Sequence, residues 1–157
     1  MDKISNIIMG VVSIAVIWLA ASCAPEQAVE ADYNVIPLPH SVRSSGSAPF
    51  RMSASTTVVA VDSAQVVNAE LFAEYIKTLT GFRLKITDRM PSDNYIRLAA
   101  SNEDAAPESY RITVASDSIV VEGADAAGTF YGLQTLRKAI RGGRGDDVLY
   151  PAAVIED

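Results

Sequence analysis

The pattern of apolar positions predicts a series of short strands in the second half of the chain. Residues 57–61 form a continuous apolar run rich in β-branched side chains, which is typical of a buried strand. Residues 83–87 and 95–99 alternate between apolar and polar positions, as expected for strands with one buried face. Residues 110–114 and 118–122 also alternate and are separated by a short polar turn. These last two segments therefore predict a β-hairpin.

Two further segments carry apolar residues at helical spacing. In the first, Asp62 to Gln65 resembles a capping box, and Gly81 provides a stop. Between them the apolar positions are Leu71, Phe72, Tyr75, Ile76 and Leu79. In the second, Asp125 can cap a helix that ends at Gly142-Gly143. Its shared face contains Phe130, Leu133, Leu136 or Arg137, and Ile140.

The ends of the folded region are predicted to be extended. Residues 35–39 contain Pro37 and Pro39, each of which keeps its predecessor out of the helical region, and residues 44–47 form a turn. Residues 149–155 would add one more extended segment. The element order β, α, β, β, β, β, α, β with an antiparallel hairpin predicts an α+β fold. We expect a mainly antiparallel sheet with two helices packed on one face.

The N-terminus has the pattern of an export signal. No residue from 4 to 22 is charged, most of this stretch is apolar, and Lys3 precedes it. Small residues directly before the lone Cys23 resemble a bacterial lipobox, which predicts a signal peptide at 1–22 and lipidation of Cys23. A retained membrane-spanning helix, with Cys23 as an unmodified small residue at its end, is the alternative. Lipidation would make this an exported, membrane-anchored lipoprotein of the periplasm or cell surface.

The composition then divides the chain after Ser22 into two parts. Residues 23–33 are rich in Ala, Pro and acidic residues without apolar periodicity, which indicates a flexible tether. The folded domain is therefore predicted at 34–157, and 157 residues with 49% hydrophobic content suit one domain. A net charge of −6 argues against a nucleic-acid partner.

Candidate chemistry is sparse. One Cys and one His, Cys23 and His40, cannot form a disulfide framework or the usual zinc site, so we expect no metal and no cofactor. His40 lies between a proline and a serine and is predicted to be a solvated turn residue. The adjacent acid pairs at 103–104 and 146–147 are predicted to be solvated loop charges rather than catalytic acids.

Three segments resemble the N-terminal, non-catalytic domain of family 20 glycoside hydrolases, the β-N-acetylhexosaminidases. They are Ile36-Pro37-Leu38-Pro39 followed by Gly46 and Phe50; residues 108–114, 119–124 and 127–136; and residues 150–157. The resemblance covers residues 34–157. It implies that the catalytic groups belong to a (β/α)8 barrel beyond the position of Asp157, so no catalytic residue is assigned to this chain.

The resemblance leaves more than one function open. The chain can be the truncated front piece of an exported enzyme that hydrolyses terminal N-acetyl-hexosamine residues, with the barrel as its partner and the glycan bound through that barrel. It can instead be a free-standing lipid-anchored domain that binds a sugar or another partner. Similar domains also precede unrelated barrels in other carbohydrate-active enzymes.

The second predicted helix lacks a charged stripe. Between residues 126 and 136 Tyr131 is the single ionisable side chain, whereas Glu70, Glu74 and Lys77 give the first helix a polar face. We therefore expect the second helix to be covered twice, by the domain's own sheet and by the barrel. The residues predicted for this interdomain packing are Gly128, Tyr131, Gly132 and Thr135.

Overall fold

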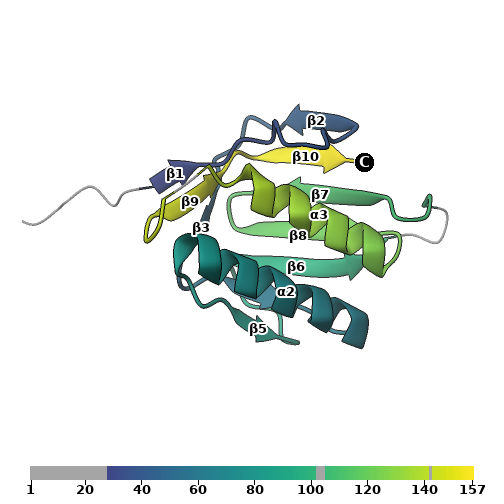
Figure 1. Ribbon diagram of the computed structural model, residues 1–157, viewed down its shortest axis with the longest axis horizontal. Helices are drawn as coiled ribbons and strands as arrows, with labels where there is room; N and C mark the ends of the chain where they lie inside the picture. The colour runs from purple at the N-terminus through teal and green to yellow at the C-terminus, as the bar shows by residue number, and fades with distance from the viewer. Residues whose placement is uncertain (1–27, 102–104, 142) are drawn as a thin grey trace, which may run out of the picture.

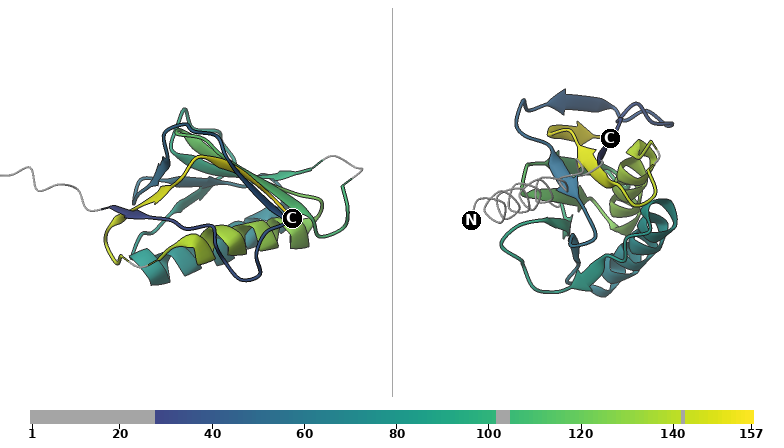
Figure 2. Two further views of the ribbon diagram at one scale, coloured as in Figure 1. Left: turned by 90° about the horizontal axis from the view of Figure 1, so that it is seen from above. Right: turned by 90° about the vertical axis from the view of Figure 1, so that its left-hand side faces the viewer.

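A computed structural model describes residues 28–101, 105–141 and 143–157 of the chain. In this region one large sheet is covered on one face by two helices, and a small three-stranded sheet lies at one end (Figure 1). Seen from above, the helices run side by side in a single layer against the sheet (Figure 2). The expected α+β class with both helices on one face is confirmed. None of the described helices is long and apolar enough to cross a bilayer.

The two helices are α2 (Ser63–Thr80) and α3 (Ala126–Ala139). The strands, in chain order, are β1 (Ala28–Glu30), β2 (Ser41–Ser44), β3 (Phe50–Met52), β4 (Thr57–Val59), β5 (Lys85–Thr87), β6 (Tyr95–Ala100), β7 (Tyr110–Val114), β8 (Ser118–Gly123), β9 (Asp147–Tyr150) and β10 (Ala153–Glu156).

The large sheet has the order β2-β10-β7-β8-β6-β4-β5 and changes character along its width. From β2 to β8 the neighbouring strands are antiparallel, and the predicted hairpin of β7 and β8 belongs to this half. From β8 to β5 they are parallel. The connecting segments explain two of these pairings. Helix α2 carries the chain from the end of β4 back to the level where β4 began, so β5 runs parallel to β4. A tight turn reverses the chain between β7 and β8, so these two strands are antiparallel.

The predicted segment 149–155 consists of two strands in two different sheets. β9 pairs with β3 and β1 in the small sheet, and β10 pairs with β7 and β2 in the large one. Pro151 lies between them, and because proline has no amide hydrogen it cannot continue a ladder. The expectation of a single extended segment was therefore wrong.

The folded region begins before residue 34. β1 pairs in parallel with β9, where Ala28 lies opposite Asp147, and both Ala31 and Tyr33 are buried. The amide of Ala31 donates to the carbonyl of Leu149 at 2.8 Å. Residues 28–33 were expected in the flexible tether, so the predicted tether extends too far. The predicted signal peptide at 1–22 and the predicted lipidation site Cys23 lie outside the described residues.

The helix caps follow the sequence signals closely. The Asp62 carboxylate accepts from the amide of Gln65 at 2.8 Å, and Gly81 ends α2 with φ +87°. The Asp125 carboxylate accepts from the amide of Gly128 at 2.8 Å at the start of α3. This helix ends at Ala139, because the backbone of Ile140 is already extended. The helix therefore stops before Gly142, the residue at which its end was predicted.

The core lies between the sheet and the helix layer. Alternate strand residues point toward the helices and are fully buried, including Val58, Ile96, Ile112, Ile119, Val121 and Ile155. They pack against helix residues Phe72, Ile76, Leu133 and Leu136. The opposite sheet face carries polar side chains such as Arg97 and Arg111, so the sheet has one buried and one open face.

Candidate interdomain surface

The two glycines of α3 bring this helix into close contact with the domain's own sheet. A Cβ atom on Gly128 would lie 2.2 Å from the carbonyl oxygen of Ser109. A Cβ atom on Gly132 would lie 2.7 Å from Cγ1 of Val121 in β8. Neither position has room for a side chain, so both glycines allow the helix backbone to approach the sheet.

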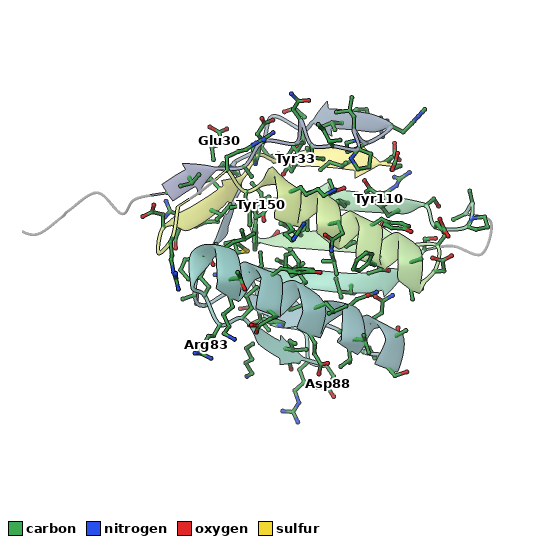
Figure 3. All side chains as sticks on the ribbon, viewed as in Figure 1. Glu30, Tyr33, Arg83, Asp88, Tyr110 and Tyr150 are labelled. Atoms are coloured by element: carbon green, nitrogen blue, oxygen red, sulfur yellow. The ribbon has the colours of Figure 1, made fainter. Side chains whose placement is uncertain are left out.

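Thr135 also belongs to the interior of the domain. Its Oγ1 lies 2.8 Å from the phenol oxygen of Tyr110, and both residues are buried. Burial raises the pKa of Tyr110 above its ordinary value. Figure 3 shows Tyr110 beside α3. Three of the four predicted interdomain residues, Gly128, Gly132 and Thr135, are therefore buried within this domain, and their packing against another domain stays a prediction.

Tyr131 is the predicted residue that remains at the surface, with 44% of its side chain exposed. It borders a groove of about 700 Å³ that runs along α3. Other residues around this groove include Pro37, Pro107, Phe130, Gln134 and Lys138. The groove thus combines apolar and aromatic side chains with the charged residues Glu108, Lys138 and Asp157.

A proline-containing loop borders the same groove and is fixed by cations from the end of α3. Lys138 Nζ donates to the carbonyl oxygen of Ile36 at 2.7 Å, and an Arg141 Nη donates to that of Asn34 at 2.6 Å. Arg141 also pairs with the Asp32 carboxylate at 3.1 Å. The Ile36 side chain is 87% exposed. The backbone contacts hold this apolar side chain in the solvent, where burial by a partner would be favourable.

The outer face of α2 carries exposed apolar side chains as well as charged ones. Val67 and Leu71, one helical turn apart, are 55% and 44% exposed. Glu74, two helical turns after Val67, lies on the same face, and Lys77 Nζ lies 2.7 Å from its carboxylate oxygen. Several exposed apolar side chains near one another on one side of a domain are typical of an interaction surface.

The described acidic residues with clear partners have structural roles. Asp125 caps α3, and Glu156 on the open sheet face pairs with Arg43 and Arg111. Asp147 was expected as a solvated loop charge, but it is buried at the start of β9 and pairs with Arg51 at 2.9 Å. His40 is exposed, as predicted. Residues 103 and 104 lie outside the described residues.

The part of the chain that the structure describes contains no group of three or more His, Cys, Asp or Glu side chains able to hold a metal ion. The fold and the surface thus define a two-layer α+β domain with exposed apolar side chains on its helix face. The chain belongs to glycosyl hydrolase family 20, since the family model described as "Glycosyl hydrolase family 20, domain 2" matches residues 32–157.

Solved structures agree with this family. The N-acetyl-β-hexosaminidase of Streptomyces plicatus is 28% identical over 80% of this chain, with a TM-score of 0.69. The family 20 β-N-acetylhexosaminidase of Streptomyces coelicolor A3(2) is 28% identical over 82% of this chain, with a TM-score of 0.70. A Vibrio harveyi family 20 enzyme at 16% identity supports the fold, with a TM-score of 0.66.

This chain corresponds to only part of those enzymes. It covers 26% of the S. plicatus chain, 27% of the S. coelicolor chain and 20% of the V. harveyi chain. Comparison with curated protein sequences gives no match.

Proposed function

We propose that this chain is the N-terminal accessory domain of an exported β-N-acetylhexosaminidase, which hydrolyses terminal N-acetyl-hexosamine residues of glycans. The family match over residues 32–157 is the observation that carries the proposal. The Streptomyces enzymes similar to it are named as hexosaminidases and are about four times longer than the matched region. In this proposal the glycan binds to the catalytic barrel and not to the domain described here.

The role of the domain is to support that barrel through its helix layer. The exposed side chains of Ile36, Val67, Leu71 and Tyr131 give the helix side an apolar surface, while the open sheet face carries ion pairs. Covering such a surface stabilises a two-domain protein by roughly 25 cal/mol for each Å² of apolar area removed from water. The helix side is therefore the side that faces the catalytic domain.

The chain by itself is proposed to be inactive. Hydrolysis in this family needs an acid that protonates the glycosidic oxygen and a carboxylate that orients the acetamido group of the substrate. Asp125, Asp147 and Glu156 are each engaged in a cap or ion pair that holds the fold. Glu156 borders a pocket with Glu122 and Asp157, but its carboxylate is paired with Arg43 and Arg111.

An activity measurement with the purified chain and with the longer protein tests this function. The 157-residue chain should not release the aryl group from an aryl N-acetyl-β-glucosaminide, while the protein that includes the following domain should. Reading the DNA after the codon for Asp157 identifies that domain. A reading frame that encodes an unrelated barrel, or none, would contradict the hexosaminidase assignment.

Lipidation of Cys23 places the enzyme at the membrane in this proposal. The support is the apolar segment before Cys23 and the small residues that directly precede it. In a bacterium that processes lipoproteins, labelled fatty acid should enter the wild-type protein and not Cys23→Ala. Equal labelling of both proteins would rule out this anchor, and the full-length mass would indicate a retained helix.

A further inference from the structure

The chain enters the domain at one end of the sheet, and Asp157 lies at the opposite end (Figure 1). β1 pairs in parallel with β9, and Ala28 lies opposite Asp147, so the first described residue is beside the start of β9. β9 and β10 then carry the chain across the molecule. Asp157 exchanges backbone hydrogen bonds with Tyr110 at the start of β7. The entry of the chain and the joint to a following domain are therefore far apart.

The end where the chain enters also contains the C-terminal ends of both helices. The amide of Gly145 donates to the carbonyl of Thr80, in the last turn of α2, at 2.8 Å. The amide of Asp32 donates to the carbonyl of Ala139, the last residue of α3, at 2.8 Å. Figure 3 shows Arg83 toward this end of the molecule. The surface formed here by residues 28, 81–83, 115–117 and 143–146 is called the anchor end.

The early start of the fold leaves a short tether. Only five backbone steps separate Cys23 from Ala28, the first residue of β1. Because each step extends the chain by at most about 3.6 Å, Ala28 lies within about 18 Å of Cys23. A compact domain of this length is about 35 Å across. A lipid on Cys23 therefore cannot let the domain turn over and place its Asp157 end on the bilayer.

The charges of the anchor end suit a position beside headgroups but are too mixed to bind a membrane alone. Arg83 and Arg144 are exposed, and within the described parts of the chain neither forms an ion pair. Arginine binds phosphate groups well. Asp117 and Asp146 belong to the same end, so both signs are present and the electrostatic attraction to an anionic surface is weak. The attachment must therefore come from the lipid on Cys23.

We propose that the anchor end rests on the lipid bilayer and that α2 and α3 extend away from it. This inference rests on lipidation of Cys23 in the proposed function, and it adds the surface that meets the headgroups. β1 begins at the anchor end, so the shortest path from Ala28 to the bilayer leads out of this end. The joint to the catalytic domain at Asp157 is then held on the side of the domain away from the membrane.

The first experiment maps which residues of the anchored enzyme contact lipid. The complete enzyme is produced in a bacterium that processes lipoproteins, with the photo-crosslinker p-benzoylphenylalanine in place of Arg144. Matched controls carry it in place of Arg97 on the open sheet face, or of Ala106 in the loop beside Asp157. After growth with radiolabelled phosphate and irradiation, labelled phospholipid on the purified protein is counted. The diacylglyceryl anchor itself contains no phosphate.

Position 144 should carry several times more phospholipid than positions 97 and 106. Labelling at position 97 or 106 equal to that at 144 would overturn the proposed orientation, because another face would then meet the bilayer. In Cys23→Ala the labelling should be lost at all three positions. Labelling that persists at position 144 without the anchor would overturn the tether as its cause.

The second experiment lengthens the tether. Insertion of about twenty Gly and Ser residues after Pro25 lets the domain turn freely, because such a linker is a flexible coil. Phospholipid labelling at position 144 should fall severalfold, toward the level at position 97, while fatty-acid incorporation at Cys23 stays unchanged. Undiminished labelling at position 144 would overturn the short tether as the source of the orientation.

The failure of this inference is distinguishable from the failure of the proposed function. If labelled fatty acid does not enter the wild-type protein, the lipid anchor is wrong and the orientation falls with it. If fatty acid enters through Cys23 but the three positions are labelled equally, the anchor stands and the proposed orientation is overturned.

Discussion

At the scale of single residues, the glycines of α3 determine how closely the helix meets the sheet. Glycine usually weakens a helix by about 1 kcal/mol relative to alanine. Gly128 and Gly132 lie where a Cβ atom would overlap Ser109 and Val121, respectively. Close packing therefore offsets the lower helix propensity at both positions.

Gly128→Ala should destabilise the domain by about 1–3 kcal/mol, because the new methyl group would lie against the Ser109 carbonyl oxygen in the tightly packed backbone. Urea unfolding followed by circular dichroism measures this change. Tyr131→Ala, at an exposed position of the same helix, is the control and should be close to neutral. A stability gain from Gly128→Ala would mean that the higher helix propensity of alanine outweighs the clash of its methyl group with the Ser109 carbonyl oxygen.

Asp125 makes the stability of the domain depend on pH. Hydrogen bonds from the amides of Gly128 and Glu108 lower its pKa below the ordinary value of 3.8. Since the folded pKa is the lower one, ionised Asp125 stabilises the fold above the unfolded pKa. This contribution is lost as the pH falls through the folded pKa.

Asp125→Asn separates that charge from the cap, because Asn keeps one acceptor oxygen. The stability difference between wild type and Asp125→Asn should be constant above about pH 5 and should shrink as the pH falls further. Urea midpoints measured across this pH range provide the test. A difference that does not change with pH would exclude the ionised carboxylate as its source.

At the scale of elements, α3 has two functionally different sides. Its sheet side contains Gly128, Gly132 and Thr135, and its outer side contains Tyr131 and Lys138. Small residues on one side and an exposed aromatic residue on the other explain why the helix lacks a charged stripe. A substitution by Glu should therefore affect stability much more on the sheet side than on the outer side.

Tyr131→Glu should leave the stability of the 157-residue chain nearly unchanged and reduce its self-association, because the tyrosine is partly exposed on an apolar surface. Thr135→Glu should cost on the order of 3 kcal/mol, because it buries a carboxylate and breaks the contact with Tyr110. Thermal unfolding and light scattering give the two measurements. Equal losses of stability from Tyr131→Glu and Thr135→Glu would contradict the conclusion that one side of α3 is buried and the other exposed.

At the scale of the whole molecule, the N-terminal segment closes the fold. Residues 28–33 join β9 through β1, and Tyr33 donates to the carbonyl of Pro151 at 2.7 Å. Arg141 pairs with Asp32 beyond the end of α3. These contacts link the start of the described chain to elements more than a hundred residues later.

A chain that starts at Asn34 should therefore be less stable than one that starts at Ala24. Removing the buried side chain of Tyr33 alone exposes enough apolar surface to cost roughly 2 kcal/mol, and the β1 ladder is lost as well. Thermal unfolding of the two purified chains measures the difference. Indistinguishable Tm values would mean that residues 28–33 contribute no stability.

The sequence by itself determined the elements whose signals are local. Asp62, Gly81 and Asp125 mark helix ends through caps that involve residues within one turn, and the hairpin of β7 and β8 follows from alternation around a short turn. The resemblance of the segments around residues 36–39, 108–136 and 150–157 led to the family, which the family match confirms.

Only the tertiary structure decided which side of each element is used. β1 has little apolar periodicity and exists because β9 pairs with it, a contact between residues more than a hundred positions apart. The lack of charge on α3 indicated two covered sides, but could not show that Gly128, Gly132 and Thr135 face the domain's own sheet. The apolar spacing left Leu136 or Arg137 open for the shared face of α3, and the structure buries Leu136 and stacks Arg137 on Tyr75 of α2. Periodicity describes one element at a time, whereas pairing, burial and unsatisfied donors depend on which other elements lie beside it.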